Sequence, residues 1–449
     1  MGSAETAAAS ERSPAGAVGL TPWQRLRNIF GGSAGNLVEW FDWFAYASFS
    51  VYFASVFFPE GDQTTQFLKT AVIFTVGFIA RPIGAWLMGI YADKAGRRAA
   101  LTLSVSMMCA GSLVIALTPG HAVIGNFAAV VLVLARVLQG LSVGGEYGAS
   151  ATYVSEMAGR NNRGFWSGFL YVTLIAGQLL ALLLLWLLQK ILTEQQLHDW
   201  GWRIPFFIGA GLAIVVFWIR RGIHETTSFH NAGVSVNERG RTMMLFTRYP
   251  TETAMIVVLT AGGGLGFYAY TTYMQKFLIN SAAGPMGEGF AKEQASQIMT
   301  TCLVIFMICQ PLVGAMSDRI GRKITLMASY GLGALAAYPI FTAIEGSTTV
   351  LQATMLCFIP LVILSGYTSM SAIVKAELFP AHVRALGVAM PYAVAQAIFG
   401  GNAETLALKL KDAGHESAFF VIVAVVLAAG FATAILMRDT KKHSLIKED

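Results

Sequence analysis

The sequence predicts an all-α integral membrane protein with twelve transmembrane helices in two six-helix bundles related by pseudo-twofold symmetry. Three observations support this prediction. The composition is too apolar for a soluble domain, about twelve apolar runs are long enough to cross a bilayer, and two motifs recur at nearly the same offset along the chain.

The composition indicates a protein that lies in lipid. The chain has 449 residues, of which 55% are hydrophobic and 12% charged, and its mean hydropathy is +0.59. A soluble domain carries about 25% charged residues. Each apolar run offers the roughly 20 residues that a spanning helix needs. The expected spans are 29–58, 66–91, 99–119, 124–155, 164–190, 203–221, 251–280, 295–316, 324–344, 350–374, 386–408 and 417–437.

The runs are expected to be helices, because in hydrocarbon only a helix or a closed barrel satisfies every backbone polar group. They also lack the alternation of polar and apolar residues that barrel strands show.

The distribution of basic residues predicts the orientation. If both termini are cytoplasmic, 22 of the 31 Lys and Arg fall on the inside, seven on the outside and two within spans. This bias follows the positive-inside rule and predicts a protein in contact with lipid, with both termini in the cytoplasm. It also accounts for the net charge of +6 without a nucleic-acid partner. Lys276 and Lys375 lie near span ends, where their side chains are expected to snorkel to the interface.

Two repeated motifs indicate that one half of the chain duplicates the other. Gly-x-x-x-Asp-x-x-Gly-Arg-Arg at 89–98 recurs as Gly-x-x-x-Asp-x-x-Gly-Arg-Lys at 314–323, and the pair Glu156 and Arg163 recurs as Glu377 and Arg384. A polar stretch separates the halves. The expected organisation is a cytoplasmic tail (1–26), an N-terminal bundle (27–221), a cytoplasmic linker (222–250), a C-terminal bundle (251–437) and a cytoplasmic tail (438–449).

The two Gly-x-x-x-Asp loops resemble the signature of the major facilitator superfamily, and the resemblance covers nearly the whole chain. It implies a transporter that works by alternating access, in which the motifs form a latch between the halves. The alternative is that these charges only anchor the topology. The expected latch residues are Asp93, Arg97, Arg98, Glu156, Arg163, Asp318, Arg322, Lys323, Glu377 and Arg384.

Further segments narrow the resemblance. Residues 35–42, 81–84 and 136–148 are similar to metabolite:proton symporters, and the shorter segments 273–276 and 375–380 most resemble α-ketoglutarate permeases. This resemblance implies secondary active symport of a dicarboxylate with protons into the cell, with α-ketoglutarate as the first candidate. Citrate, shikimate or a zwitterionic osmolyte remains open as the substrate.

Five charged residues deep in expected spans are the candidate site, because charges in lipid are costly and usually functional. They are Glu39, Asp42, Arg81, Arg136 and Glu146. Arg81 is expected to bind a substrate carboxylate, since a guanidinium offers a planar bidentate fork and stays charged. The alternative is that Arg81 is locked in an ion pair with Asp42 or Glu39.

Asp42 and Arg136 are the expected proton-coupling pair, because protonation of the acid would release the arginine. A static pair that fixes helix packing is the alternative. Glu39, one turn from Asp42, and Glu146 are further candidate proton sites.

Two polar residues are candidates for the carbonyl oxygen of the substrate. Tyr46 lies one turn from Asp42 on the same helix face, and Gln139 lies one turn from Arg136. The alternative is structural, since most polar residues in membranes only join helices.

Other classes of function lack their required residues. No phosphate loop of the Gly-x-x-x-x-Gly-Lys-Ser/Thr type occurs, and the seven histidines and four cysteines show no metal-ligand spacing. We therefore expect no enzyme activity, no metal and no cofactor. As a separate expectation, the protein functions as a monomer. A channel or receptor built from twelve helices remains open, since duplication alone does not establish alternating access.

Overall fold

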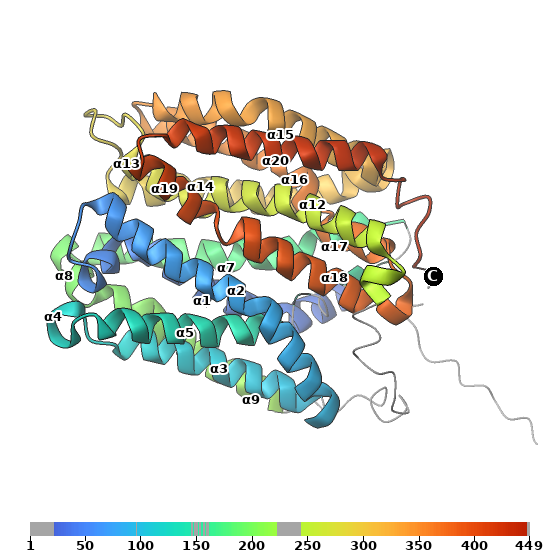
Figure 1. Ribbon diagram of the computed structural model, residues 1–449, viewed down its shortest axis with the longest axis horizontal. Coiled ribbons are helices and arrows are strands. Elements are labelled where there is room, and N and C mark those ends of the chain that lie inside the picture. Colours follow the sequence, from blue (N-terminus) through green and yellow to red (C-terminus); the bar gives the residue numbers. More distant parts are fainter. Residues whose placement is uncertain are drawn as a thin grey trace, which may run out of the picture.

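The computed structural model describes residues 22–95, 97–144, 147, 151, 154–155, 158, 161–221 and 244–446. Within these residues the chain forms helices and no strands. Figure 1 shows an elongated bundle in which most helices run along one direction, with the first half of the chain below and most of the second half above. The long axis of the bundle is the direction in which the helices would cross a membrane.

The described part of the first half contains six long helices and three short segments. These are α1 (Pro22–Phe57), α2 (Gln63–Ala95), α3 (Arg97–Leu117), α4 (His121–Ile124), α5 (Phe127–Val143), α7 (Arg163–Ile191), α8 (Glu194–Asp199), the 3₁₀ turn η1 (Gly201–Arg203) and α9 (Ile204–Arg221).

The second half contains more interrupted helices. These are α12 (Pro250–Tyr268), the π-helical segment η2 (Ala269–Tyr273), α13 (Met274–Asn280), α14 (Lys292–Ile320), α15 (Arg322–Glu345), α16 (Val350–Thr368), α17 (Ser371–Glu377), α18 (Ala381–Ala395), the π-helical segment η3 (Gln396–Gly400), α19 (Ala403–Asp412) and α20 (Glu416–Leu436).

All twelve expected spans are mainly helical where the structure describes them. Seven helices are long and apolar enough to cross a membrane, and three shorter apolar segments lie at 103–117, 127–143 and 201–215, counted over the described residues. The other two expected spans, 29–58 and 386–408, form α1 and the series α18, η3 and α19. The linker expected at 222–250 lies mostly outside the described residues.

Three spans of the second half are broken, which the apolar pattern did not predict. The π-helical segments η2 and η3 interrupt two of them, and a turn at 369–370 separates α16 from α17 in the third. A hydropathy pattern reports the length of a span and not its hydrogen-bond register, so it cannot reveal such breaks. Irregular helices at membrane depth usually border a cavity, and π-segments are frequent at functional sites.

The halves meet along two main contacts. In the first, α7 packs against α14 so closely that a Cβ added to Gly164 would lie 2.4 Å from the carbonyl oxygen of Gly314. In the second, α2 packs against α18, η3 and α19, and the Thr75 hydroxyl donates to the carbonyl of Gly401 over 2.7 Å. A pocket lies between the halves.

Candidate functional site

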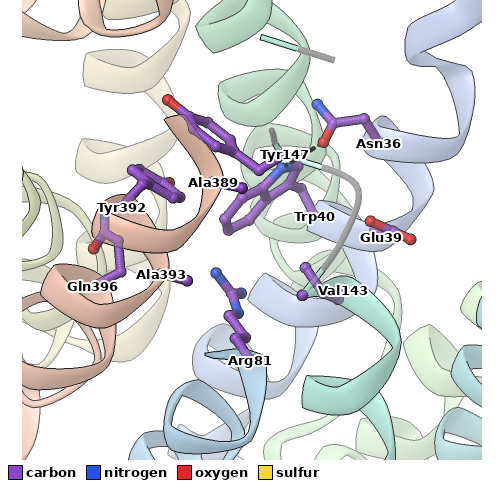
Figure 2. Close-up of a pocket in the computed structure, with 11 residues that line it drawn as sticks. Asn36, Glu39, Trp40, Arg81, Val143, Tyr147, Ala389, Tyr392, Ala393 and Gln396 are labelled. Carbon is purple, nitrogen blue, oxygen red and sulfur yellow. Dashed lines mark hydrogen bonds between the residues drawn. The ribbon is translucent and has the colours of Figure 1, made fainter. Parts of the chain in front are cut away.

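The pocket is lined by both halves of the chain and holds about 390 Å³ of space, including the part that opens to solvent. Figure 2 shows side chains from α1 and α2 on one side and from α18 and η3 on the other. The lining residues are Asn36, Glu39, Trp40, Arg81, Val143, Gly144, Tyr147, Ala389, Tyr392, Ala393 and Gln396.

Arg81 is the cation of this pocket. Its guanidinium points into the space, and the residue is 4% exposed. It lies 4.0 Å from the ring of Trp43 and 4.1 Å from that of Phe78. Its Nε and one terminal nitrogen have no hydrogen-bond partner, and it forms no ion pair, among the residues that the structure describes. The Glu39 carboxylate and the Tyr268 side chain interact electrostatically with this guanidinium.

Arg136, on α5, is the second buried arginine and does not line the pocket. Its guanidinium lies 3.9 Å from the Trp43 ring and 4.5 Å from the Tyr46 ring. Trp43 therefore contacts both Arg81 and Arg136. Such contacts between cations and aromatic faces contribute up to about 2 kcal/mol each when desolvated, which explains how two arginines remain buried so near one another.

Asp42 and Arg136 do not contact each other directly, contrary to the expected pair. Gln139 lies between them: Arg136 donates to Gln139 Oε1 over 2.7 Å, and Gln139 Nε2 donates to Asp42 Oδ2. The Ser112 hydroxyl donates to Asp42 Oδ1 over 2.5 Å. The Gln139 amide occupies the space between the two charged groups, and on the other side α9 passes so near Asp42 that a Cβ on Gly209 would lie 2.5 Å from Oδ1.

Two of the three residues expected to bind substrate lie away from the pocket. Gln139 is fully buried in the relay to Asp42, and Tyr46 donates its hydroxyl to the carbonyl of Thr70 over 3.1 Å. Neither lines the pocket, whereas Arg81 does.

The first helix contributes two further polar residues to the pocket wall. Glu39, expected as a rival proton site, lines the pocket. Asn36 lines it too, and its side chain is held by a 3.1 Å bond to Thr173 and a 2.9 Å bond from the Trp40 indole. The sequence reading did not select Asn36, although it lies one turn before Glu39 on the same face of the helix.

The snorkelling expected for Lys276 and Lys375 is wrong. Both residues are 2% exposed. Lys276 forms an ion pair with Glu404 of α19, and Lys375 donates to the hydroxyls of Ser371 and Tyr147. Both lie on the broken spans, where neighbouring helices supply polar partners within the bundle. The sequence contained a signal for the Lys276–Glu404 pair, since Glu404 is an acidic residue inside the expected span 386–408.

The second copy of the repeated motif joins the halves at one end of the bundle, which we call the motif end. The Asp318 carboxylate accepts hydrogen bonds of 2.9 Å from the amides of Gly164 and Phe165 at the start of α7. Arg322 donates to Asp318 over 2.8 Å and lies 3.8 Å from Glu377. Because Asp318 belongs to one half and α7 to the other, this cluster holds the two halves together.

Two other expected latch residues bond to groups of the second half, among the residues that the structure describes. Lys323 donates to the carbonyl of Ile435, and Arg384 donates to those of Phe379 and Leu445. These bonds fasten helix ends within one bundle.

The segment 438–446, expected as a tail, packs on the motif end. There the Thr440 hydroxyl donates to Glu377 over 2.6 Å. Arg163, from the first half, is buried and interacts electrostatically with the same carboxylate. Glu377 therefore lies among groups from both halves.

Several expected residues cannot be placed. Glu146 and Glu156 lie outside the described residues, and of Asp93, Arg97 and Arg98 only the helical backbone is described.

Ionic contacts also join the halves at the opposite end, which we call the α8 end. Lys190 of α7 pairs with Glu293 of α14, and Lys292 donates to Glu194 over 2.8 Å. The ring of His198 lies 3.2 Å from the Lys292 ammonium. Burial, followed by the nearby ammonium of Lys292, lowers the pKa of His198 below its ordinary value of 6.5.

The described residues contain no group of three or more His, Cys, Asp or Glu side chains that could hold a metal ion. What the geometry supports is binding and release. A buried guanidinium faces a pocket between two halves, which touch at both ends of the bundle.

Comparisons with known proteins bear on this arrangement. The family "Sugar (and other) transporter" matches residues 29–230, and the family "Major Facilitator Superfamily" matches residues 265–448. The α-ketoglutarate permease of Escherichia coli (strain K12) is 49% identical over 93% of this chain and 95% of its own length. A citrate-proton symporter of Salmonella typhi is 30% identical over 85% of this chain and 87% of its own length.

Solved structures agree on the fold. The xylose transporter XylE from E. coli, in a partially occluded inward-open conformation, superposes with a TM-score of 0.70 at 15% identity, over 92% of this chain and 97% of that one. The two-bundle fold of twelve helices predicted above is the fold of this family. On these grounds the chain belongs to the major facilitator superfamily and is a transmembrane transporter.

Proposed function

We propose that this chain is a proton-coupled symporter that carries a dicarboxylate, with α-ketoglutarate as the first candidate, by alternating access. The observation that carries the proposal is Arg81. It is a buried guanidinium in a pocket between the halves, with two nitrogens that lack a hydrogen-bond partner among the described residues. A buried charge is costly until it is paired, so such a group favours an anion.

A carboxylate suits Arg81 better than other anions of similar charge. The guanidinium presents parallel N–H groups that a carboxylate accepts in a bidentate pair. The aromatic rings of Trp43 and Phe78 fix its plane, and Trp40 lies 4.9 Å away. The 49% identity to an α-ketoglutarate permease makes that keto acid the first dicarboxylate to test.

Asp42 is the proposed proton-coupling acid, and Gln139 is its link to Arg136. An ionised Asp42 accepts from the Gln139 amide, which leaves Oε1 directed to Arg136. A protonated Asp42 can donate instead, which favours the reversed amide and removes the acceptor from Arg136. Since Trp43 contacts both arginines, this change reaches the substrate cation.

The proposed alternation exchanges the two sets of contacts between the halves. Opening at the motif end would break the bonds from Asp318 to α7, and opening at the α8 end would break the Lys190–Glu293 and Lys292–Glu194 pairs.

The proposed orientation follows from the positive-inside rule. The motif end, the linker at 222–250 and both tails then lie in the cytoplasm of a bacterial inner membrane. One chain contributes the whole pocket lining, so we propose that the monomer, surrounded by lipid, is the functional unit.

Transport in proteoliposomes tests the proposal. Labelled α-ketoglutarate should accumulate inside vesicles when an inward proton gradient is imposed, and its addition should acidify the vesicle interior. Flux without a proton requirement would indicate a channel, and binding without flux a receptor. Neither accumulation nor binding of α-ketoglutarate would reject the proposed substrate.

A competition panel separates the remaining substrates. Citrate, shikimate and glycine betaine should each compete less well than α-ketoglutarate for the same uptake. Citrate is the second candidate, because a 30% identical relative is a citrate-proton symporter. Stronger competition by citrate would move the assignment to tricarboxylates, while stronger competition by the betaine would remove Arg81 as the anchor of an anion.

A further inference from the structure

Lys375 is a buried lysine of the second half that the pocket lining does not include. It lies on α17, next to the break in the span formed by α16 and α17. Its Nζ donates to the hydroxyl of Ser371 over 2.7 Å and to that of Tyr147 over 3.2 Å. Ser371 belongs to the same helix, whereas Tyr147 belongs to the first half of the chain.

Aromatic rings surround the ammonium group. Nζ lies 4.2 Å from the ring centroid of Tyr392 and 5.2 Å from that of Tyr147. These two rings stack on each other, with centroids 3.6 Å apart and planes inclined by 8°. Both tyrosines line the pocket into which Arg81 points. In Figure 2 the hydroxyl of Tyr147 points away from Arg81. This hydroxyl accepts from Lys375, which is not among the residues that line the pocket.

Lys375 has no carboxylate partner among the described residues. The other buried lysine of this half, Lys276, does have one in Glu404. Hydroxyl groups and aromatic faces offset only part of the cost of an uncompensated buried ammonium. The two hydroxyls can also be exchanged for a stronger acceptor, because charge-assisted bonds are roughly twice as strong as neutral ones.

Resting on the function proposed above, we propose that Lys375 binds the second carboxylate of the substrate. Tyr147 turns aside, the ammonium meets the carboxylate, and Arg81 holds the other carboxylate. One dicarboxylate then connects the two halves of the transporter through one cation from each. A monocarboxylate can reach only one of these cations, so Lys375 determines the preference for two carboxylates over one.

The charges of the site agree with this assignment. The buried charges recognised in the sequence supply two cations, Arg81 and Arg136, and the latter does not line the pocket. Arg81 alone leaves one charge of a dianion uncompensated. Lys375 supplies the missing positive charge without any added group.

The test compares two keto acids that differ in one carboxylate, α-ketoglutarate and 2-oxopentanoate, in the purified full chain. Binding of each would be measured for the wild type, Lys375→Gln and Lys375→Arg. The glutamine can still donate to Ser371 and Tyr147 but has no charge, while the arginine keeps the charge. Arg81 is unchanged in all three, so binding of 2-oxopentanoate reports that each variant is folded.

We expect Lys375→Gln to weaken α-ketoglutarate binding by about 30-fold or more, as when a buried charge partner is removed, and to change 2-oxopentanoate binding by less than about threefold. Lys375→Arg should keep most of the preference for the dicarboxylate. An equal loss for both acids in Lys375→Gln, or no loss for either, would overturn the proposal.

A wild type that binds neither acid would reject the proposed function itself, so the two failures are distinguishable. If Lys375→Gln does not fold, binding of the two keto acids to Lys375→Arg and to Tyr147→Phe tests the proposal instead. Removal of the competing hydroxyl should preserve or tighten α-ketoglutarate binding, and a selective loss in Tyr147→Phe would contradict the role of Lys375.

Discussion

Arg136 donates a 2.7 Å hydrogen bond to Gln139, and Gln139 in turn donates to Asp42. The acid and the arginine thus communicate through one amide group. An amide is well suited to this position, because it has a donor and an acceptor and can reverse when the proton on its neighbour changes.

Replacement of Gln139 tests the relay. Gln139→Met keeps a similar length and removes both hydrogen bonds, so protonation of Asp42 can no longer influence Arg136. Uptake against a gradient should fall by about tenfold or more, while exchange of labelled for unlabelled substrate should change little. The matched control is Gln178→Met, which removes a buried amide of α7 outside the relay. Equal effects of both substitutions would contradict the relay.

Arg81→Lys tests the substrate contact. A lysine keeps the positive charge but cannot form two parallel bonds to a carboxylate, and it fits less well against the rings of Trp43 and Phe78. The apparent affinity for α-ketoglutarate should fall by about tenfold or more. Near-normal affinity in Arg81→Lys, measured by substrate competition, would remove Arg81 from the site.

Asp318→Asn tests the latch at the motif end. The carboxylate accepts from two backbone amides of α7, and loss of its charge should weaken both bonds. The motif end should open more often. The rate of alkylation of Ser167→Cys, a buried position on α7, should rise by about fivefold or more in a background without Cys109 and Cys309.

The control for this latch is Asp62→Asn, the same change at a carboxylate that bonds Thr65 within one half. Alkylation should stay at the wild-type rate in this variant. An equal rise in both variants, or none in Asp318→Asn, would mean that Asp318 does not close the motif end.

His198 makes closure at the α8 end sensitive to pH. Burial and Lys292 lower its pKa, although Glu194 and Asp199 oppose this effect. A base whose pKa is depressed in the closed form favours closure while it is neutral. Closure is therefore complete above the ordinary pKa of 6.5 and weakens as the pH falls below it.

Spin labels on two exposed positions of the α8 end, Gln195→Cys and Glu288→Cys, measure this opening. The distance distribution should extend to longer values at about pH 5.5 than at about pH 7.5, because an imidazolium beside Lys292 is repelled. His198→Gln should show little pH dependence. A shift of the same size in His198→Gln would assign the effect to another group.

The sequence predicted the parts of this transporter that depend on composition and periodicity. The twelve spans and the burial of Asp42, Arg81 and Arg136 agree with the structure. Both features follow from the free-energy cost of placing a charge or an unpaired backbone group in hydrocarbon. This cost depends on each residue and its near neighbours in the sequence.

The sequence did not predict contacts that depend on how distant helices meet. The stacking of Tyr147 on Tyr392 and the environment of Lys375 require the two halves to be placed against each other. Lys375 also lies one residue beyond the expected span 350–374, because the break between α16 and α17 is invisible to hydropathy.

The relay was missed for a different reason. The sequence predicted that Asp42 and Arg136 form a pair, but the position of Gln139 between them depends on side-chain rotamers. The spacing of residues along the sequence does not predict these rotamers.

Protonation of Asp42 is the step through which we propose that the proton gradient drives transport, and Asp42→Asn removes that step. Asparagine imitates the protonated acid at nearly constant volume, so the variant should bind the dicarboxylate and exchange it across the membrane. Accumulation against a gradient should disappear, because the step that requires proton release is bypassed.

Counterflow and uphill uptake should be measured together for Asp42→Asn and for Glu39→Gln, the rival one turn away that lines the pocket. We predict intact counterflow without uphill uptake in Asp42→Asn. Uphill uptake that survives in Asp42→Asn would contradict this coupling, and its loss in Glu39→Gln alone would transfer the coupling role to Glu39.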